Sequence, residues 1–282
     1  MKIHAIQTGE VQIKSRHVEA RFRPRPLRIA DILADRTWSP RLPIRAFAIE
    51  HPDGVIVVDT GESSHANDPG YQPRWHPFVQ TSERRWVEPH EEVGPQLRAL
   101  GIEPGDVRCL VMTHMHGDHA GGLSHFEGVE ILMSATEASM ALARTGSLNG
   151  YLNSHYPDWL DPRTIELDRD PWESFEASHA LTGDGAVRLV PTPGHTKGHL
   201  SVVVVQADHL VLLTGDATYS DDALRRGVLD GVAQDEKAHW RSTALLRELC
   251  GRHPTVVAPT HDPLTADRLA APTFSLAAKV GT

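Results

Sequence analysis

The chain has 282 residues, of which 40% are hydrophobic and 23% charged, and its formal net charge is −9 at pH 7. This length suffices for one large domain with a substantial core, and the composition is typical of a globular protein. The acidic balance argues against a nucleic-acid partner, because neutralising phosphates requires a basic face. No apolar stretch approaches the roughly 18 residues of a membrane span, and the N-terminus lacks the apolar core of a secretory signal, so a cytoplasmic location is expected.

Two segments in the first third of the chain are dense in Pro, Arg and Trp and lack periodicity, namely residues 15–45 and 61–90. Such segments are typical of lids and binding loops. Within the first of them, the basic stretch 21–28 is expected to be a solvated arm stiffened by prolines. Nothing marks a domain linker, so residues 1–282 are expected to form a single domain.

Strand-like runs rich in β-branched residues recur along the rest of the chain. They cover residues 47–51, 54–61, 107–114, 129–134, 186–194, 200–216 and 255–262. The long run at 200–216 predicts a hairpin that turns at Ala207 and Asp208. This series of runs predicts more than one layer of sheet.

Helix-like stretches alternate with these runs at residues 88–101 and 235–251. In the second stretch, Ala238, Leu245 and Leu249 are expected to share the buried face. The mixture favours sheets covered by helices over an all-α or all-β protein.

A histidine-rich turn follows the run at 107–114. It reads THMHGDHAGG and places His114, His116, Asp118 and His119 within six residues. Imidazole and carboxylate groups are the ligands that suit zinc and neighbouring borderline metals. Adjacent residues such as Asp118 and His119 point in different directions and need not bind the same ion, so the pattern favours a second metal.

Three more ligand-type residues stand where apolar runs end: His195, Asp216 and His261. Strand ends are where an α/β protein usually offers such side chains. Together with the histidine-rich turn, they favour a dinuclear site. His199, four residues beyond His195, is expected to support its loop by hydrogen bonding and not to bind metal.

The stretches THMHGDH, PGHTKGH, TGD and THD resemble, in type and order, the metallo-β-lactamase superfamily. The resemblance runs from about residue 43 to 265 and implies an αββα sandwich with two divalent metals at one edge. Zinc is the expected metal, with iron, cobalt and manganese as alternatives. The resemblance also implies that Asp59, in the stretch VVDTG, orients a ligand histidine. The implied ligands are His114, His116 and His195 for one ion and Asp118, His119 and His261 for the other, with Asp216 bridging.

The superfamily hosts many reactions, so the fold does not name the substrate. Residues 214–222 read TGDATYSDD, and Tyr219 lies three residues past Asp216, as in the N-acyl homoserine lactonases that this stretch and THDP at 260–263 resemble. Glyoxalase-II-like thioesterases usually carry a Thr-Leu-Phe type sequence there. The resemblance implies a quorum-quenching lactonase that opens the lactone ring of N-acyl homoserine lactones, with a small-molecule lactone or ester as its partner.

In the expected mechanism, hydroxide bridging the two ions attacks the lactone carbonyl. Tyr219 stabilises the developing oxyanion, and Asp118 passes a proton to the leaving alkoxide. The alternatives are a glyoxalase-II-like thioesterase, another ester or lactone hydrolase on the same metals, an iron redox enzyme, and a metal-stabilised binding module. His116 argues against the redox enzyme, because the diiron reductases of this fold usually have glutamate there. Seven intact ligand positions argue against a structural site, which needs four.

An acyl tail requires an apolar channel, and four aromatic residues of the two irregular segments are its expected suppliers. They are Trp38, Trp75, Phe78 and Trp86. The alternative is that they pack against a second subunit in a homodimer.

Overall fold

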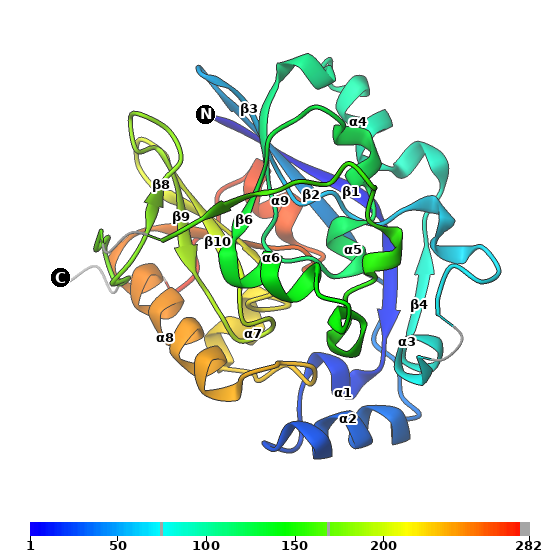
Figure 1. Ribbon diagram of the computed structural model, residues 1–282. Helices are drawn as coiled ribbons and strands as arrows, with labels where there is room; N and C mark the ends of the chain where they lie inside the picture. The colour runs from blue at the N-terminus through cyan, green and yellow to red at the C-terminus, as the bar shows by residue number, and fades with distance from the viewer. Residues whose placement is uncertain (74–75, 168–169, 277–282) are drawn as a thin grey trace.

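Two β-sheets lie face to face, and helices cover their outer surfaces (Figure 1). The computed structural model describes residues 1–73, 76–167 and 170–276. The larger sheet has the order β4 (Glu83–Trp86), β1 (Lys2–Ile13), β2 (Leu42–His51), β3 (Gly54–Val58), β5 (Val107–Val111), β6 (Ile131–Ser134) and β7 (Arg163–Ile165). The smaller sheet has the order β12 (Thr255–Pro259), β11 (Leu210–Gly215), β10 (Leu200–Val205), β9 (Val187–Pro191) and β8 (His179–Ala180).

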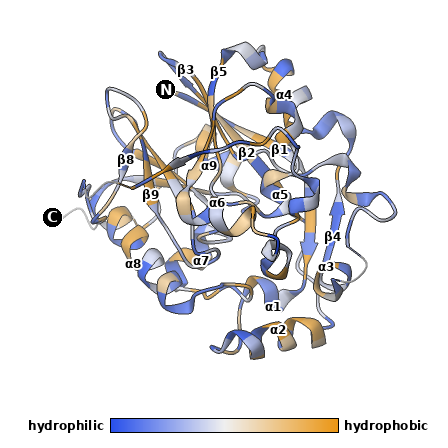
Figure 2. Ribbon diagram, viewed as in Figure 1, coloured by the Kyte–Doolittle hydropathy of each residue, from blue (hydrophilic) through white to orange (hydrophobic). Residues whose placement is uncertain are grey.

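The strands separate a core between the two sheets from a core on the outer face of each sheet, because successive side chains point to opposite faces of a sheet. In β10, Val202 and Val204 pack between the two sheets, whereas Val203 packs against the helices outside the smaller sheet. In β3, Ile56 packs between the two sheets, whereas Val57 packs on the outer face of the larger sheet. Hydrophobic residues therefore concentrate in the strands where the sheets meet (Figure 2).

Helices cover both outer faces, which completes the αββα sandwich. They are α1 (Ser15–Val18), α2 (Arg25–Ala34), α3 (Pro77–Ser82), α4 (Val93–Ala99), α5 (Gly117–Ala120), α6 (Ala135–Ala141), α7 (Asp221–Arg226), α8 (Glu236–Arg252) and α9 (Thr265–Ala270). The predicted fold class is confirmed. Among the described residues, no helix has the length and hydropathy that spanning a bilayer requires.

The predicted hairpin at 200–216 is present, since β10 and β11 pair antiparallel with Val205 opposite Leu210. The helix predicted at 235–251 is α8, and Asp235 caps it by accepting a hydrogen bond of 2.9 Å from the Ala238 amide.

The expected buried face of α8 is correct for Leu249, which is fully buried, and only partly correct for the other two residues. Ala238 and Leu245 are only partly buried, while His239, Ser242 and Leu246 are fully buried. The reason is that His239 and Ser242 donate hydrogen bonds to buried backbone carbonyls, so polar residues share the inner face. The expectation considered apolar residues alone and therefore missed the polar residues on the buried face.

The two segments expected to be irregular contain short regular elements. Residues 15–45 include α1 and α2, and residues 61–90 include α3 and β4. Figure 1 shows α1 and α2 together below the sandwich, next to the long strand β1.

Arg28 corrects the expectation of a solvated basic arm. Its side chain is 2% exposed, and Nε donates to the Gly231 carbonyl at 3.1 Å. Other guanidinium nitrogens donate to the carbonyls of Ala233 and Arg23. A buried guanidinium requires such partners, and here they attach α2 to the loop that precedes α8.

Replacing Arg28 with Met should lower the free energy of unfolding by about 1–3 kcal/mol, because buried carbonyls lose their donors. Urea denaturation followed by circular dichroism measures the change. Arg36→Met, at an exposed position of the same segment, is the matched control and should have little effect. Equal stability of the two variants would contradict the assigned anchoring role of Arg28.

Candidate metal centre

The seven candidate ligands meet at one edge of the sandwich because the strands that precede them end there. β3 runs parallel to β5, and β11 runs parallel to β12. β9 and β11 both pair antiparallel with β10 and therefore share a direction. The loops that leave β5, β9, β11 and β12 thus emerge on the same side of the molecule and bring together chain segments that are far apart in sequence.

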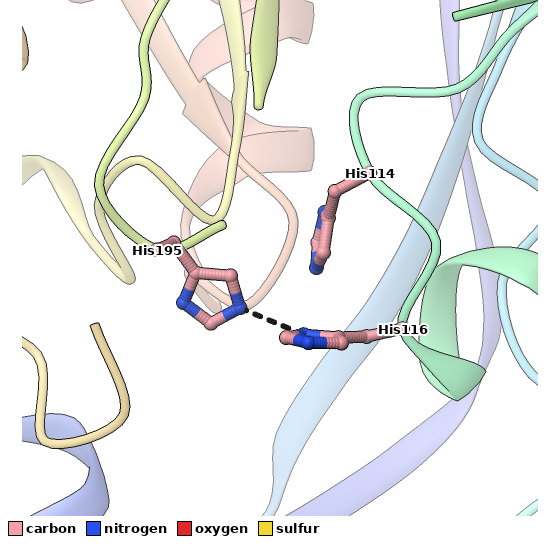
Figure 3. A group of neighbouring side chains, drawn as sticks. All are labelled: His114, His116 and His195. Carbon is pink, nitrogen blue, oxygen red and sulfur yellow. Dashed lines mark hydrogen bonds between the residues drawn. The ribbon is translucent and has the colours of Figure 1, made fainter. Parts of the chain in front are cut away.

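All seven residues fall into three groups in which the ligand-type atoms lie within 4.8 Å of one another. Figure 3 shows the first group, with three imidazole rings turned towards one another and the Nδ1 of His116 at 2.9 Å from the Nε2 of His195. The groups are His114, His116 and His195; His114, His119 and Asp216; and Asp118, His119 and His261.

Asp216 connects the groups. Its Oδ1 lies 3.3 Å from the Nε2 of His119 and 3.4 Å from the Nε2 of His261, and its Oδ2 lies 3.5 Å from the Nε2 of His195. The Nε2 of His261 also lies 3.3 Å from the Oδ2 of Asp118. One carboxylate is therefore shared by histidines of different groups, as a bridging ligand would be.

Several atoms of this cluster are buried without a hydrogen bond, namely the Nε2 atoms of His114 and His119 and the Oδ1 of Asp216. Buried polar atoms are normally hydrogen-bonded, and leaving one unpaired costs about 1–3 kcal/mol. All three atoms are metal-ligand types. The donor set therefore fits divalent cations.

The candidate ligand histidines differ in protonation, since neighbouring carboxylates raise the pKa values of His119 and His195 against the effect of burial. Burial and the neighbouring imidazoles hold the pKa of His114 well below its usual value, and burial lowers the pKa of His116 to about 3. Burial also acts to lower the pKa of His261, but the carboxylates of Asp216 and Asp118 raise it to about 10. The rings of His114 and His116 are thus neutral and can donate a lone pair at once, whereas binding a cation at His261 would release a proton.

Asp59 lies beneath the cluster and supports it. Its carboxylate accepts hydrogen bonds from the Thr113 amide at 2.7 Å, the Thr113 hydroxyl at 2.8 Å and the Nδ1 of His119 at 2.8 Å. The backbone of Asp59 has φ +57°, a left-handed conformation that costs about 1–3 kcal/mol for a residue other than glycine. The surrounding hydrogen bonds hold it there, and they fix the His119 ring with its Nε2 towards Asp216.

His199 makes the hydrogen bonds expected of a supporting residue. Its Nδ1 is 2.8 Å from the Thr192 hydroxyl, and its Nε2 accepts from the Asp216 amide at 3.1 Å. Both ring nitrogens are used within the protein. Nearby, Gly194 has φ +151°, and an added Cβ would lie 2.5 Å from the Cα of His239. The loop that carries His195 can therefore pack against α8 only with glycine at this position.

Sequence reasoning missed two buried acids. Asp230 is 3% exposed, and its Oδ2 lies 3.2 Å from the Nδ1 of His195. Glu137 accepts from the Met115 amide and the Thr196 hydroxyl, and it thereby connects the loops that carry His116 and His195. Each is a single acid outside any motif, so no spacing in the sequence marked them.

A cavity of about 310 Å³ opens on to the cluster. At one end it is lined by His116, Asp118, His195, Asp216, Tyr219 and His261. Its apolar wall comes mainly from β1 and the segments around α2 and α3, and includes Val11, Ile13, Ile29, Phe78, Val79 and Leu152. The size is at the lower end of the usual range for small-molecule sites.

The expected aromatic channel is only partly correct, because Phe78 lines the cavity but Trp38 and Trp86 do not. The Trp38 ring lies 4.0 Å from the side-chain cations of both Lys14 and Arg84. Trp86 similarly stacks with an arginine, so these indoles serve cation–π contacts instead. Trp75 lies outside the described residues.

Comparison with known proteins agrees with this geometry. Residues 40–261 match the family model of the metallo-beta-lactamase superfamily. The chain belongs to the metallo-β-lactamase superfamily. Its His/Asp clusters are typical of a dinuclear metal site of that superfamily. The chain spans only 57% of the length of the first relatives that it matches.

The chain is similar to a probable metallo-hydrolase of Mycobacterium tuberculosis, with 35% identity over 188 residues. The matched residues make up 65% of this chain and 57% of that protein. It is 30% identical over 234 residues to the N-acyl homoserine lactonase AttM of Azorhizobium caulinodans, covering 79% of this chain and 82% of the relative. A solved N-acyl homoserine lactone hydrolase with N-hexanoyl-L-homoserine at its catalytic metal centre superposes with a TM-score of 0.76 at 23% identity, covering 94% and 95% of the two chains. This last likeness establishes the shared fold.

Asp230→Asn should weaken zinc binding by about 10–100-fold, because the His195 ring loses the charged partner that orients it. Competition with a chromophoric chelator measures the affinity. Asp208→Asn, at an exposed acid in the turn between β10 and β11, is the control. Zinc affinity equal to that of the control would contradict the role given to Asp230.

Proposed function

We propose that this metallo-hydrolase opens the lactone ring of N-acyl homoserine lactones and so acts as a quorum-quenching lactonase. The observation that carries the proposal is the position of Tyr219 in the cavity wall beside the metal-ligand cluster. Its ring centroid lies 5.5 Å from that of His261 and 6.2 Å from that of His195. The similarity to the AttM lactonases over most of the chain supports the same substrate class.

In this proposal His114, His116 and His195 bind one ion, and Asp118, His119 and His261 bind the other, with Asp216 bridging. Zinc is the proposed metal. When bound, two divalent ions polarise a carbonyl group and supply a nucleophile from water at neutral pH.

The protein's own groups would complete the reaction. Burial raises the pKa of Tyr219 well above its usual value, so the phenol keeps its proton and can donate a hydrogen bond to a developing oxyanion. Asp118 lines the cavity and is held by His261. Burial acts to raise its pKa, but its hydrogen bond to His261 and the neighbouring histidines lower it, so Asp118 is ionised. It can therefore accept a proton from the attacking water and pass it on to the leaving alkoxide.

Tyr219→Phe should lower kcat for N-hexanoyl homoserine lactone by about 10²–10³-fold, because one oxyanion donor is lost. Proton release measures the rate, and metal analysis should find the same two equivalents as in the unmodified protein. An unchanged rate would show that the hydroxyl has no role in the reaction.

The thioesterase alternative is tested by substrate choice. We expect hydrolysis of N-acyl homoserine lactones to exceed that of S-lactoylglutathione, and Asp216→Asn to abolish both by disrupting the proposed bridging position. Faster hydrolysis of the thioester would replace the lactonase proposal with a glyoxalase-II-like activity.

A further inference from the structure

His17 forms part of the cavity wall, yet no known motif includes it. It belongs to the short helix α1, is 6% exposed and lines the cavity together with Tyr219 and Phe78. Its ring centroid lies 6.0 Å from that of Tyr219 and 5.7 Å from that of Phe78. The imidazole therefore lies beside Tyr219, which is itself next to the candidate ligands His195 and His261.

The backbone fixes His17 relative to the metal centre. Its amide donates to the Lys14 carbonyl at 2.9 Å, and its carbonyl accepts from the Gly231 amide at 2.8 Å. The residue before Gly231 is Asp230, whose carboxylate lies against His195. The same loop therefore contacts both His17 and the candidate ligand His195, so the position of His17 relative to the metal-ligand cluster is fixed by hydrogen bonds.

The His17 ring has no hydrogen-bonding partner in residues 1–73, 76–167 and 170–276, and its Nδ1 is buried. Burial lowers the pKa of His17, so the ring is neutral at pH 7 and presents one N–H donor and one nitrogen acceptor. Nε2 is not among the buried unpaired atoms, so it is the ring nitrogen through which His17 can hydrogen-bond a molecule in the cavity.

We propose that His17 is a specificity-determining residue that hydrogen-bonds the amide of the substrate's acyl chain. This inference rests on the proposed lactonase function. In an N-acyl homoserine lactone the amide nitrogen is bonded to the ring carbon next to the lactone carbonyl, so an amide is always close to the attacked carbon. The accessible nitrogen of a neutral imidazole can pair with an amide in either tautomer, donating to the amide carbonyl or accepting from the amide N–H.

This role predicts that the enzyme prefers lactones that carry an amide over lactones whose alkyl chain merely fits the apolar wall of the cavity. A site built to hydrogen-bond a substrate group discriminates against an analogue that lacks it, because the site's own polar atoms then stay unpaired. The matched pair of substrates is N-hexanoyl homoserine lactone and α-hexyl-γ-butyrolactone, which carries an alkyl chain on the same ring carbon but no amide.

The experiment compares kcat/KM for the two lactones in the zinc-loaded wild-type enzyme, His17→Phe and His17→Asn. The wild type should prefer the amide lactone by about tenfold or more, the worth of one good hydrogen bond. His17→Phe should lose that preference while retaining activity on the alkyl lactone, and His17→Asn should restore part of it. Metal content and melting temperature report on folding.

The outcomes separate the two proposals. A wild type that hydrolyses both lactones equally well would overturn the role of His17, even if the Phe variant fails to fold, and would leave the lactonase function standing. An equal loss on both substrates in His17→Phe, without rescue by Asn, would also overturn it. A wild type that hydrolyses neither lactone would overturn the proposed function and this inference together.

Discussion

The carboxylate of Asp216 contacts three imidazoles that come from separate parts of the chain, and the rest of the site is arranged around this contact. Its oxygens lie within 3.5 Å of His119, His195 and His261. A buried carboxylate is unfavourable unless it is paired or bound to metal, so the surrounding loops must deliver cations or protons to it. Divalent ions would satisfy both the carboxylate and the imidazole nitrogens that lack hydrogen bonds, which accounts for so many titratable groups at one sheet edge.

Precise placement of the ligands depends on a second set of buried polar residues. Asp59, which has a left-handed backbone conformation, orients the His119 ring. Asp230 orients the His195 ring in the same way. His199 holds the backbone of Asp216 through its amide. Three of the seven candidate ligands, His119, His195 and Asp216, are thus held by buried side chains that do not themselves belong to the candidate ligand set.

The two ends of the cavity have different origins. The metal end is built from loops at strand ends within the sandwich, whereas the opposite wall comes from β1 and the helices α1, α2 and α3 that pack outside it. Arg28 fastens α2 to the loop containing Asp230 and Gly231, so the outer wall is attached to the same loop that orients His195.

The sequence by itself determined the fold class, the hairpin at 200–216 and the set of seven ligand-type residues, because strand periodicity and the clustered His and Asp residues are local properties. Only the tertiary structure decided which side chains complete the site. Asp230, Glu137 and His17 are single residues without a motif, and their importance arises from packing between segments that are distant in the sequence. Trp38 and Trp86 are the opposite case. The tertiary structure places them against basic side chains, and they do not line the cavity. A local sequence pattern shows the chemical type of a residue, but its burial and its contacts depend on the fold of the whole chain.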